Sequence, residues 1–259
     1  MSQEGWSGEV VEVIAHRGFS SLAPENTLAA MELAISSKAH RVEFDVQSTR
    51  DGVPVVLHDD TLERTTNGKG RVCDKTYQEI SKLDAGSWFH PDFRGERVPT
   101  LDMVLELCKG KIPVNVEIKS EDSSNGIEMK VLDALRRHGS VDSTTVSSFE
   151  SKVLERVRML DPRITLETLY NNSRRPPGPK DLCIAKDSGA SAFNLSLEEL
   201  IHREELVLEA HSLGLGLKVY TVDDLPRFRR LLALKVDGVF TNRPDALLSI
   251  LREGLEPRG

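Results

Sequence analysis

Two acidic residues alternate with apolar ones in a single short stretch, Arg41-Val42-Glu43-Phe44-Asp45-Val46. Alternation with a period of two indicates a β-strand, so Glu43 and Asp45 point to the same face. Two carboxylates on one face of a buried strand repel each other and lose hydration, and a positive charge between them relieves both costs. A divalent cation fits, because hard cations prefer oxygen ligands. An exposed strand with a polar face would produce the same pattern, so the rest of the chain decides between the two.

A second stretch, Pro113-Val114-Asn115-Val116-Glu117-Ile118-Lys119, has the same design. Its apolar residues take one face, and Glu117 and Lys119 take the other. Glu43, Asp45 and Glu117 then make a three-carboxylate site for one divalent cation. Carboxylate ligands favour Mg²⁺, Ca²⁺ or Mn²⁺ over zinc or copper.

Basic and imidazole side chains follow other predicted strands. His16 and Arg17 come directly after the strand 10–15, and His58 ends the short strand 53–57. Arg17 and Lys119 can bind a phosphate, and with a cation they neutralise a phosphoryl group. His16 and His58 can serve as acid and base on either side of one phosphorus atom. The remaining histidines are expected to be packing residues: His40, His90, His138, His202 and His211.

Strands and helices alternate along the chain in a way that would bring these side chains together. We expect strands at 10–15, 41–46, 113–119, 144–147, 164–169, 191–195, 216–222 and 237–241. A helix is expected after each one, and Asn26 or Thr27 caps the first. Eight such units predict a TIM (β/α)8 barrel with its active site at the carboxyl ends of the strands. A doubly wound open sheet is the alternative, but no Gly-rich phosphate loop follows the first strand.

Residues 47–99 interrupt this repeat and are read as a small inserted subdomain between strand two and its helix, within a single domain of residues 1–259. The interruption holds the short strand before His58, a capping box formed by Thr76 and Glu79, and irregular turns.

Composition limits the function classes. The formal net charge of −7 is spread along the chain, which argues against general nucleic-acid or anionic-membrane binding. The three cysteines, Cys73, Cys108 and Cys183, make neither a disulfide framework nor a zinc spacing. Residues 1–8 have no apolar core typical of a signal peptide, and no run is apolar enough to span a membrane. We therefore expect a cytoplasmic protein without stable membrane insertion.

Several motifs in order make the chain similar to the glycerophosphodiester phosphodiesterase family. They are His16-Arg17-Gly18, Pro24-Glu25-Asn26-Thr27, Glu43-Phe44-Asp45, Asp51-Gly52, His58-Asp59, Leu62 with Arg64-Thr65-Thr66, Gly68-Lys69-Gly70, Leu83-Asp84-Ala85-Gly86, Pro99-Thr100-Leu101, Asn115-x-Glu117-Ile118-Lys119, Ser148-Phe149 and Asp237-Gly238-Val239-Phe240-Thr241-Asn242-Arg243-Pro244. The resemblance covers nearly the whole chain. It implies a barrel with an inserted subdomain, a cation held by Glu43, Asp45 and Glu117, an acid-base pair of His16 and His58, and phosphate binding by Arg17 and Lys119.

The chain departs from the family pattern at two places. Members often carry Trp-Thr-Val-Asn where this chain has Tyr220-Thr221-Val222-Asp223, and Asp where it has Asn242. Both departures are expected to lie away from the cation and the histidines and to affect the shape of the alcohol pocket.

The resemblance implies hydrolysis of glycerophosphodiesters to sn-glycerol 3-phosphate and an alcohol. One histidine deprotonates a glycerol hydroxyl that attacks phosphorus, and the other protonates the leaving alcohol. His16 is favoured as the first base, although the order stays open.

Three other readings remain. A lysophospholipase D would need an apolar channel, for which Phe19, Leu22, Trp88, Phe89 and Phe93 are candidates, although packing within the insert suits these side chains better. A non-catalytic phosphate-binding module would not need the complete set of histidines and carboxylates. Schiff-base chemistry at Lys119 is not expected, because a lysine beside Glu117 and a cation stays protonated.

Overall fold

The computed structural model describes residues 11–119, 126–170 and 175–255. The segment 1–8, where no signal peptide is predicted, and residues 171–174 of the predicted loop before Pro179 lie outside these ranges. Among the described residues, no helix is both long and apolar enough to cross a membrane.

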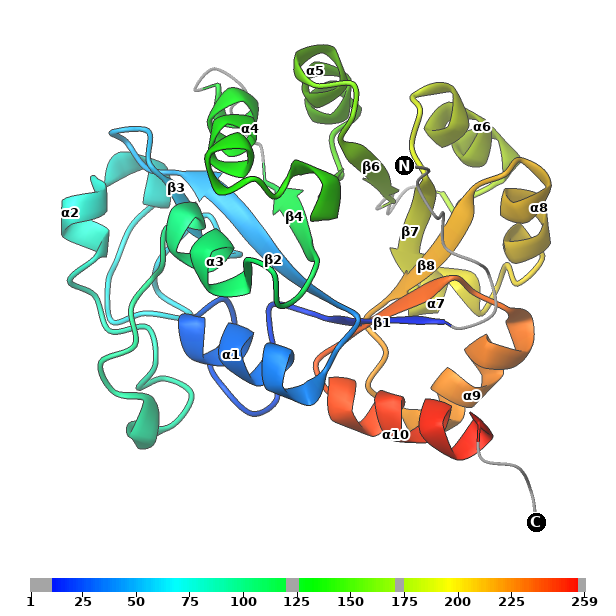
Figure 1. Cartoon of the computed structure of the whole chain (residues 1–259), viewed down its shortest axis with the longest axis horizontal. Coiled ribbons are helices and arrows are strands. Elements are labelled where there is room, and N and C mark those ends of the chain that lie inside the picture. Colours follow the sequence, from blue (N-terminus) through cyan, green and yellow to red (C-terminus); the bar gives the residue numbers. More distant parts are fainter. Residues whose placement is uncertain (1–10, 120–125, 171–174, 256–259) are drawn as a thin grey trace.

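A closed barrel of parallel strands forms the centre of the described chain (Figure 1). Its first strand pairs with both the second and the last, which closes the ring. In chain order the barrel strands are β1 (Glu12–Ala15), β2 (Arg41–Ser48), β4 (Val114–Ile118), β5 (Thr144–Ser148), β6 (Thr165–Leu169), β7 (Ala192–Ser196), β8 (Gly216–Tyr220) and β9 (Gly238–Thr241). The predicted TIM barrel is confirmed and the open sheet is wrong.

Helices follow the strands and form the outer ring in Figure 1. They are α1 (Leu28–Ser37), α3 (Leu101–Cys108), α4 (Ile127–His138), α5 (Ser151–Leu160), α6 (Pro179–Asp187), α8 (Leu206–Ser212), α9 (Leu225–Leu234) and α10 (Pro244–Leu255). Thr27, one of the two predicted caps, accepts a hydrogen bond at the start of α1. A short helix, α7 (Leu197–Leu200), was not predicted, although the Ser196 and Glu199 capping box that begins it is visible in the sequence.

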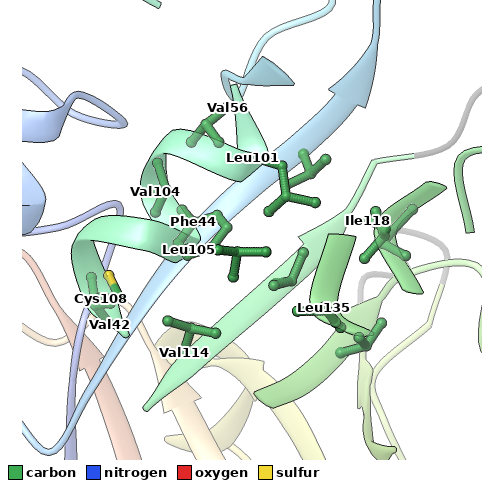
Figure 2. Close-up of a cluster of buried hydrophobic side chains, with 14 of the residues drawn as sticks. Val42, Phe44, Val56, Leu101, Val104, Leu105, Cys108, Val114, Ile118 and Leu135 are labelled. Carbon is green, nitrogen blue, oxygen red and sulfur yellow. The ribbon is translucent and has the colours of Figure 1, made fainter. Parts of the chain in front are cut away.

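The alternation in β2 separates the hydrophobic core from the barrel interior. Val42 and Phe44 face outward and pack against α3 and β4, where Figure 2 shows them beside Leu105 and Val114. Glu43 and Asp45 must therefore face the inside of the barrel. Both faces of the strand are buried, so the reading of β2 as an exposed strand with a polar face is wrong.

The segment between β2 and α3 leaves the barrel and returns to it, and it holds a hydrophobic cluster of its own. Strand β3 (Pro54–Val56) pairs antiparallel with β2, and helix α2 (Tyr77–Ile80) and the 3-10 helices η1 (Val72–Asp74) and η2 (Pro91–Phe93) follow. The predicted capping box of Thr76 and Glu79 begins α2. The cluster consists of Val55, Leu57, Leu62, Val72, Ile80, Ala85 and Val98. This segment lies to one side of the barrel in Figure 1 and brings His58 to its carboxyl end.

Candidate active site

A tight turn after β1 places His16 and Arg17 at the carboxyl end of the barrel. Arg17 has a φ of 57° and Gly18 a φ of 82°, a region that favours glycine. A Cβ on Gly18 would lie 2.6 Å from the Cβ of Ala30, so the turn also needs glycine for its close approach to α1. The backbone N–H of Arg17 donates to Glu43 Oε2 at 2.9 Å and ties the turn to β2.

The three predicted carboxylates meet at one point. One oxygen from each of Glu43, Asp45 and Glu117 lies within 4.8 Å of the others. Parallel pairing sets Asp45 of β2 directly beside Glu117 of β4, which brings their side chains to the same level of the barrel. Glu43 and Asp45 are buried and Glu117 nearly so.

Two cations flank this acidic cluster. Arg17 Nε lies 3.4 Å from Asp45 Oδ2, and Lys119 Nζ lies 3.1 Å from Glu117 Oε1 and 3.7 Å from Asp45 Oδ1. Burial opposes ionisation of the Asp45 carboxyl, but Arg17, His58 and Lys119 together hold its pKa below the usual range. The charges of Glu117 and Asp45 likewise outweigh burial and raise the pKa of Lys119.

The positive charges of Arg17 and Lys119 do not neutralise all three carboxylates. Burial and then the charge of Asp45 raise the pKa of Glu43 well above its usual value, and the same causes raise the pKa of Glu117 to about 7. Glu43 Oε1 is buried and accepts no hydrogen bond from the described part of the chain, and the buried Glu117 Oε1 has the Lys119 ammonium at 3.1 Å as its ion-pair partner. Three carboxylates that meet at one point, one of them with an oxygen that has no donor, fit a hard divalent cation. The acidic cluster could therefore hold one metal ion.

Asn26 supports the cluster, a role that the sequence did not suggest. Its Nδ2 donates to Asp45 Oδ2 at 2.8 Å and its Oδ1 accepts from the Asp45 backbone N–H at 3.3 Å. Asn26 has a φ of 60°, a conformation that asparagine tolerates better than most residues.

His16 is held from the last strand of the barrel. Its Nδ1 lies 2.9 Å from Asn242 Oδ1, and Asn242 in turn donates through Nδ2 to Asp223 Oδ2 at 2.7 Å. The expectation that the departures lie away from the histidines is therefore wrong for Asn242, which contacts His16, and Asp223 lies behind Asn242. Asn242 lies 226 positions after His16 along the chain. Barrel closure brings the two residues into contact.

His58 is held by a different kind of partner. Its Nδ1 lies 2.6 Å from Asp59 Oδ1, and Arg64 donates to both oxygens of Asp59 at 2.6 and 2.9 Å. Arg64 also donates two bonds of 2.8 Å to Glu25, which accepts a third from Arg17. This series of ion pairs joins the inserted segment to the turn after β1.

Both histidines open onto one cavity of about 160 Å³. His16, Arg17, Glu43, His58 and Glu117 line it together with Ser147, Phe149, Leu169, Tyr220, Thr221 and Phe240. A wider cavity of about 400 Å³ adjoins it and shares three of these lining residues, His58, Glu117 and Phe149. The wider cavity has polar walls that include Asp59, Asp60, Lys119, Ser148 and Glu150.

The remaining histidines, His40, His90, His138, His202 and His211, line neither cavity. His40 accepts from the backbone N–H of Val13, and His138 and His211 pair with carboxylates on the outer surface. The site residues that sequence reasoning did not assign to roles are Glu25, Asn26, Asp59, Arg64, Asp223 and Asn242. All of them stand in the quoted stretches, and of these residues only Asp59 adjoins a predicted site residue, His58, along the chain.

Comparison with known proteins points to one family. The profile of the glycerophosphoryl diester phosphodiesterase family matches residues 16–246. A glycerophosphodiester phosphodiesterase of Caldanaerobacter subterraneus is 39% identical over 244 residues, which are 93% of this chain and 98% of that protein. One from Bacillus subtilis is 34% identical over 253 residues, covering 92% of this chain and 86% of that protein.

Solved structures agree with this result. A phosphodiesterase of Oleispira antarctica, in complex with the product sn-glycerol-3-phosphate, superposes with a TM-score of 0.87 at 29% identity. The match covers 93% of this chain and 96% of that one.

Proposed function

The chain belongs to the glycerophosphoryl diester phosphodiesterase family, a family of phosphoric diester hydrolases, and we propose that it hydrolyses glycerophosphodiesters to sn-glycerol 3-phosphate and an alcohol. One observation carries the proposal. Two imidazoles, two carboxylates of the acidic cluster and the Arg17 guanidinium line a single cavity of about 160 Å³. These are the groups that a phosphodiester needs around it for charge neutralisation and proton transfer.

The carboxylates of Glu43, Asp45 and Glu117 would hold one divalent cation, with Mg²⁺, Ca²⁺ and Mn²⁺ as the candidates. When bound, such an ion supplies positive charge to phosphate and hydroxyl oxygens. Arg17 and Lys119 add two further positive charges and bind the phosphate.

The partners of the two histidines support His16 as the first base and His58 as the first acid. His16 faces a neutral amide, and burial followed by the charge of Arg17 lowers its pKa to about 4, so the ring is neutral and free to accept a proton. His58 Nδ1 lies beside the carboxylate of Asp59, which accepts a ring proton at Nδ1 and orients Nε2 away from it. The first step requires a neutral base and a proton donor.

The proton transfers balance over two steps. His16 takes the proton of a glycerol hydroxyl, its oxygen forms a bond to phosphorus, and the bond to the alcohol oxygen breaks as His58 donates its proton. A cyclic phosphate and the free alcohol result. Water then attacks phosphorus and loses its proton to His58, the bond from phosphorus to the attacking glycerol oxygen of the first step breaks, and His16 returns its proton to that oxygen. Both imidazoles end in their initial states.

The wider cavity is the place we assign to the leaving alcohol, because it meets the smaller one at His58. Its charged walls suit a small polar alcohol better than an acyl chain. The aromatic residues considered for a lysolipid channel line neither cavity: Trp88, Phe89 and Phe93 pack edge to face with one another in the insert. We therefore favour glycerophosphodiesters over lysophospholipids.

Residues 47–99 act in this proposal as an inserted subdomain that carries the acid, within one domain. The hydrophobic cluster of that segment and its ion pairs to Glu25 support this division. We also propose a cytoplasmic location, which the three unpaired thiols of Cys73, Cys108 and Cys183 support. Fractionation of cells that produce the chain tests the location.

The function is tested by incubating the chain with glycerophosphocholine, glycerophosphoethanolamine, glycerophosphoglycerol and lysophosphatidylcholine, with Mg²⁺, Ca²⁺ and Mn²⁺ in turn. We expect sn-glycerol 3-phosphate from the first three and loss of turnover in EDTA that a divalent cation restores. Release of choline from the lysolipid alone would overturn the choice of substrate. Full turnover after rigorous metal removal would overturn the cation site.

A further inference from the structure

Asp223 and Asn242 form a hydrogen-bonded unit behind His16. The carboxylate of Asp223 accepts three hydrogen bonds: from Thr241 Oγ1 at 2.9 Å, from the backbone N–H of Asn242 at 2.7 Å and from Asn242 Nδ2 at 2.7 Å. Asp223 follows β8 and Asn242 follows β9, so the unit spans two neighbouring strands.

This arrangement determines which way the Asn242 amide points. A carboxylate only accepts, so the side of the amide that faces Asp223 must be its NH₂ group. The amide oxygen then faces His16 Nδ1 at 2.9 Å. Ser20 Oγ lies 2.8 Å from the same oxygen and 2.8 Å from the His16 carbonyl oxygen, and its single proton can go to either of them. An amide oxygen only accepts, so its contact with His16 requires the proton of the neutral His16 ring on Nδ1 and leaves Nε2 free.

The charges around His16 come from several elements. Arg17 beside it disfavours the charged ring, while Asp45 on β2 and Glu25 on the turn before α1 favour it. The amide of Asn242 adds no charge. Burial is the largest influence, and together these groups hold the pKa of His16 near 4.

The departures from the family pattern at Asp223 and Asn242 form one compensated exchange, in which the substitution at Tyr220 takes no part. Members often carry Asn at the position of Asp223 and Asp at the position of Asn242, and this chain has the two residue types in exchanged places. Either order gives one carboxylate facing one amide. The exchange keeps that contact and moves the negative charge from the position next to His16 to the position behind it.

We propose that Asp223 and Asn242 are a coupled positioning pair that holds His16 as a neutral base with Nε2 directed to the substrate. This inference rests on the proposed function only in giving His16 the role of a base. The tautomer itself does not depend on activity, so the two can fail separately.

The tautomer is tested by ¹⁵N NMR of the histidine rings in the full chain at pH 7. The expected spectrum shows His16 neutral with its proton on Nδ1. A proton on Nε2, or an imidazolium at this pH, would overturn the inference even in an active enzyme. An inactive enzyme with the expected tautomer would instead overturn the proposed function.

The coupling is tested with Asp223→Asn, Asn242→Asp and the double variant. Asn242→Asp sets two carboxylates face to face, and Asp223→Asn frees the Asn242 amide to turn its NH₂ group toward His16. We expect each single variant to lose kcat/KM by at least about 10-fold, which corresponds to about 1.4 kcal/mol. The double variant restores an amide facing a carboxylate and should recover most of the activity.

The pH profile separates positioning from mere structure. In the double variant a carboxylate adjoins His16, so the acidic limb of kcat/KM should move to higher pH than in the wild type. Asp237→Asn is the matched control, because Asp237 pairs with His211 at 2.8 Å at the other end of β9. It should leave the profile unchanged. Losses in the single variants that multiply in the double variant, or an acidic limb that stays in place, would overturn the coupling.

Discussion

The carboxyl of Glu117 allows the cation site to be tested by stability instead of activity. In the metal-free protein, burial and then the charge of Asp45 raise its pKa from 4.5 to about 7, and this value already includes the opposing effect of Lys119. The pKa in the folded state lies above that in the unfolded state. The contribution to stability is therefore complete below pH 4.5 and is lost as the pH rises through 7. At about 1.4 kcal/mol for each pH unit, the loss by about pH 8 amounts to about 3 kcal/mol.

Glu117→Gln removes the ionisable group and keeps the shape of the side chain. We expect the metal-free variant to exceed the metal-free wild type in free energy of unfolding by up to about 3 kcal/mol at pH 8, and to match it near pH 4.5. A divalent cation should reverse the order. It binds the ionised ligands of the folded wild type, and at 1,000 times its Kd it stabilises that state by about 4.1 kcal/mol, which exceeds the loss of about 3 kcal/mol.

The measurement is urea unfolding followed by circular dichroism, at both pH values, in EDTA and in excess Mg²⁺, Ca²⁺ or Mn²⁺. Glu128→Gln is the matched control, because Glu128 is a buried glutamate of α4 that pairs with Arg156 at 2.8 Å outside both cavities. It should lose stability at pH 8 and keep the full response to the cation. If Glu117→Gln were less stable than the wild type at pH 8 in EDTA, or gained as much from the cation, the assignment of uncompensated charge would be refuted.

Three further predictions concern the acid, the alcohol pocket and the turn after β1. His58→Ala should lower kcat for glycerophosphocholine by about 10²- to 10⁴-fold, but far less for a p-nitrophenyl ester, whose leaving group needs no proton; equal losses on both substrates would exclude the acid role. Asp60 and Glu150 line the wider cavity, so their replacement by Asn and Gln should raise the KM for a diester with a cationic alcohol by about 3- to 10-fold. The KM for a diester with a neutral alcohol should stay unchanged, and an equal rise in both KM values would contradict the assignment of this cavity to the alcohol. Gly18→Ala should lower the free energy of unfolding by about 2–5 kcal/mol. Gly110→Ala is the control, because Gly110 also has a positive φ but faces open space, and it should cost about 1–2 kcal/mol. Similar losses for the two variants in urea unfolding would show that the turn at Gly18 has room for a side chain beside α1.

The strands and the acidic cluster could be predicted because both follow from local periodicity. Alternation in β2 and β4 assigns a face to every residue, so the inward direction of Glu43, Asp45 and Glu117 needs no knowledge of distant chain segments. The barrel then places the ends of adjacent strands together. Helix α7 escaped notice because it has a single turn, although its capping box was present.

The second set of site residues could not be predicted in this way, because their contacts span large distances along the chain. Asn26 reaches Asp45 across 19 residues, Arg64 reaches Glu25 across 39 and Asn242 reaches His16 across 226. No periodicity relates these positions. They depend on barrel closure and on how the inserted segment packs. The expectation for Asn242 was wrong because closure brings the residue that follows β9 beside the turn after β1.

The supports of the two histidines give a physical reason for the proposed roles of His16 as base and His58 as acid. His16 follows barrel strand β1 and faces the Asn242 amide, whose orientation Asp223 determines. This amide has no charge that would stabilise a protonated His16 ring. His58 stands on the inserted segment, against a carboxylate that Arg64 holds in place. Arg64 also binds Glu25, so the ion pairs that hold Asp59 beside His58 add to the β2–β3 pairing that joins the inserted segment to the barrel. In the proposed mechanism, the position of the acid therefore depends on how this segment packs against the barrel.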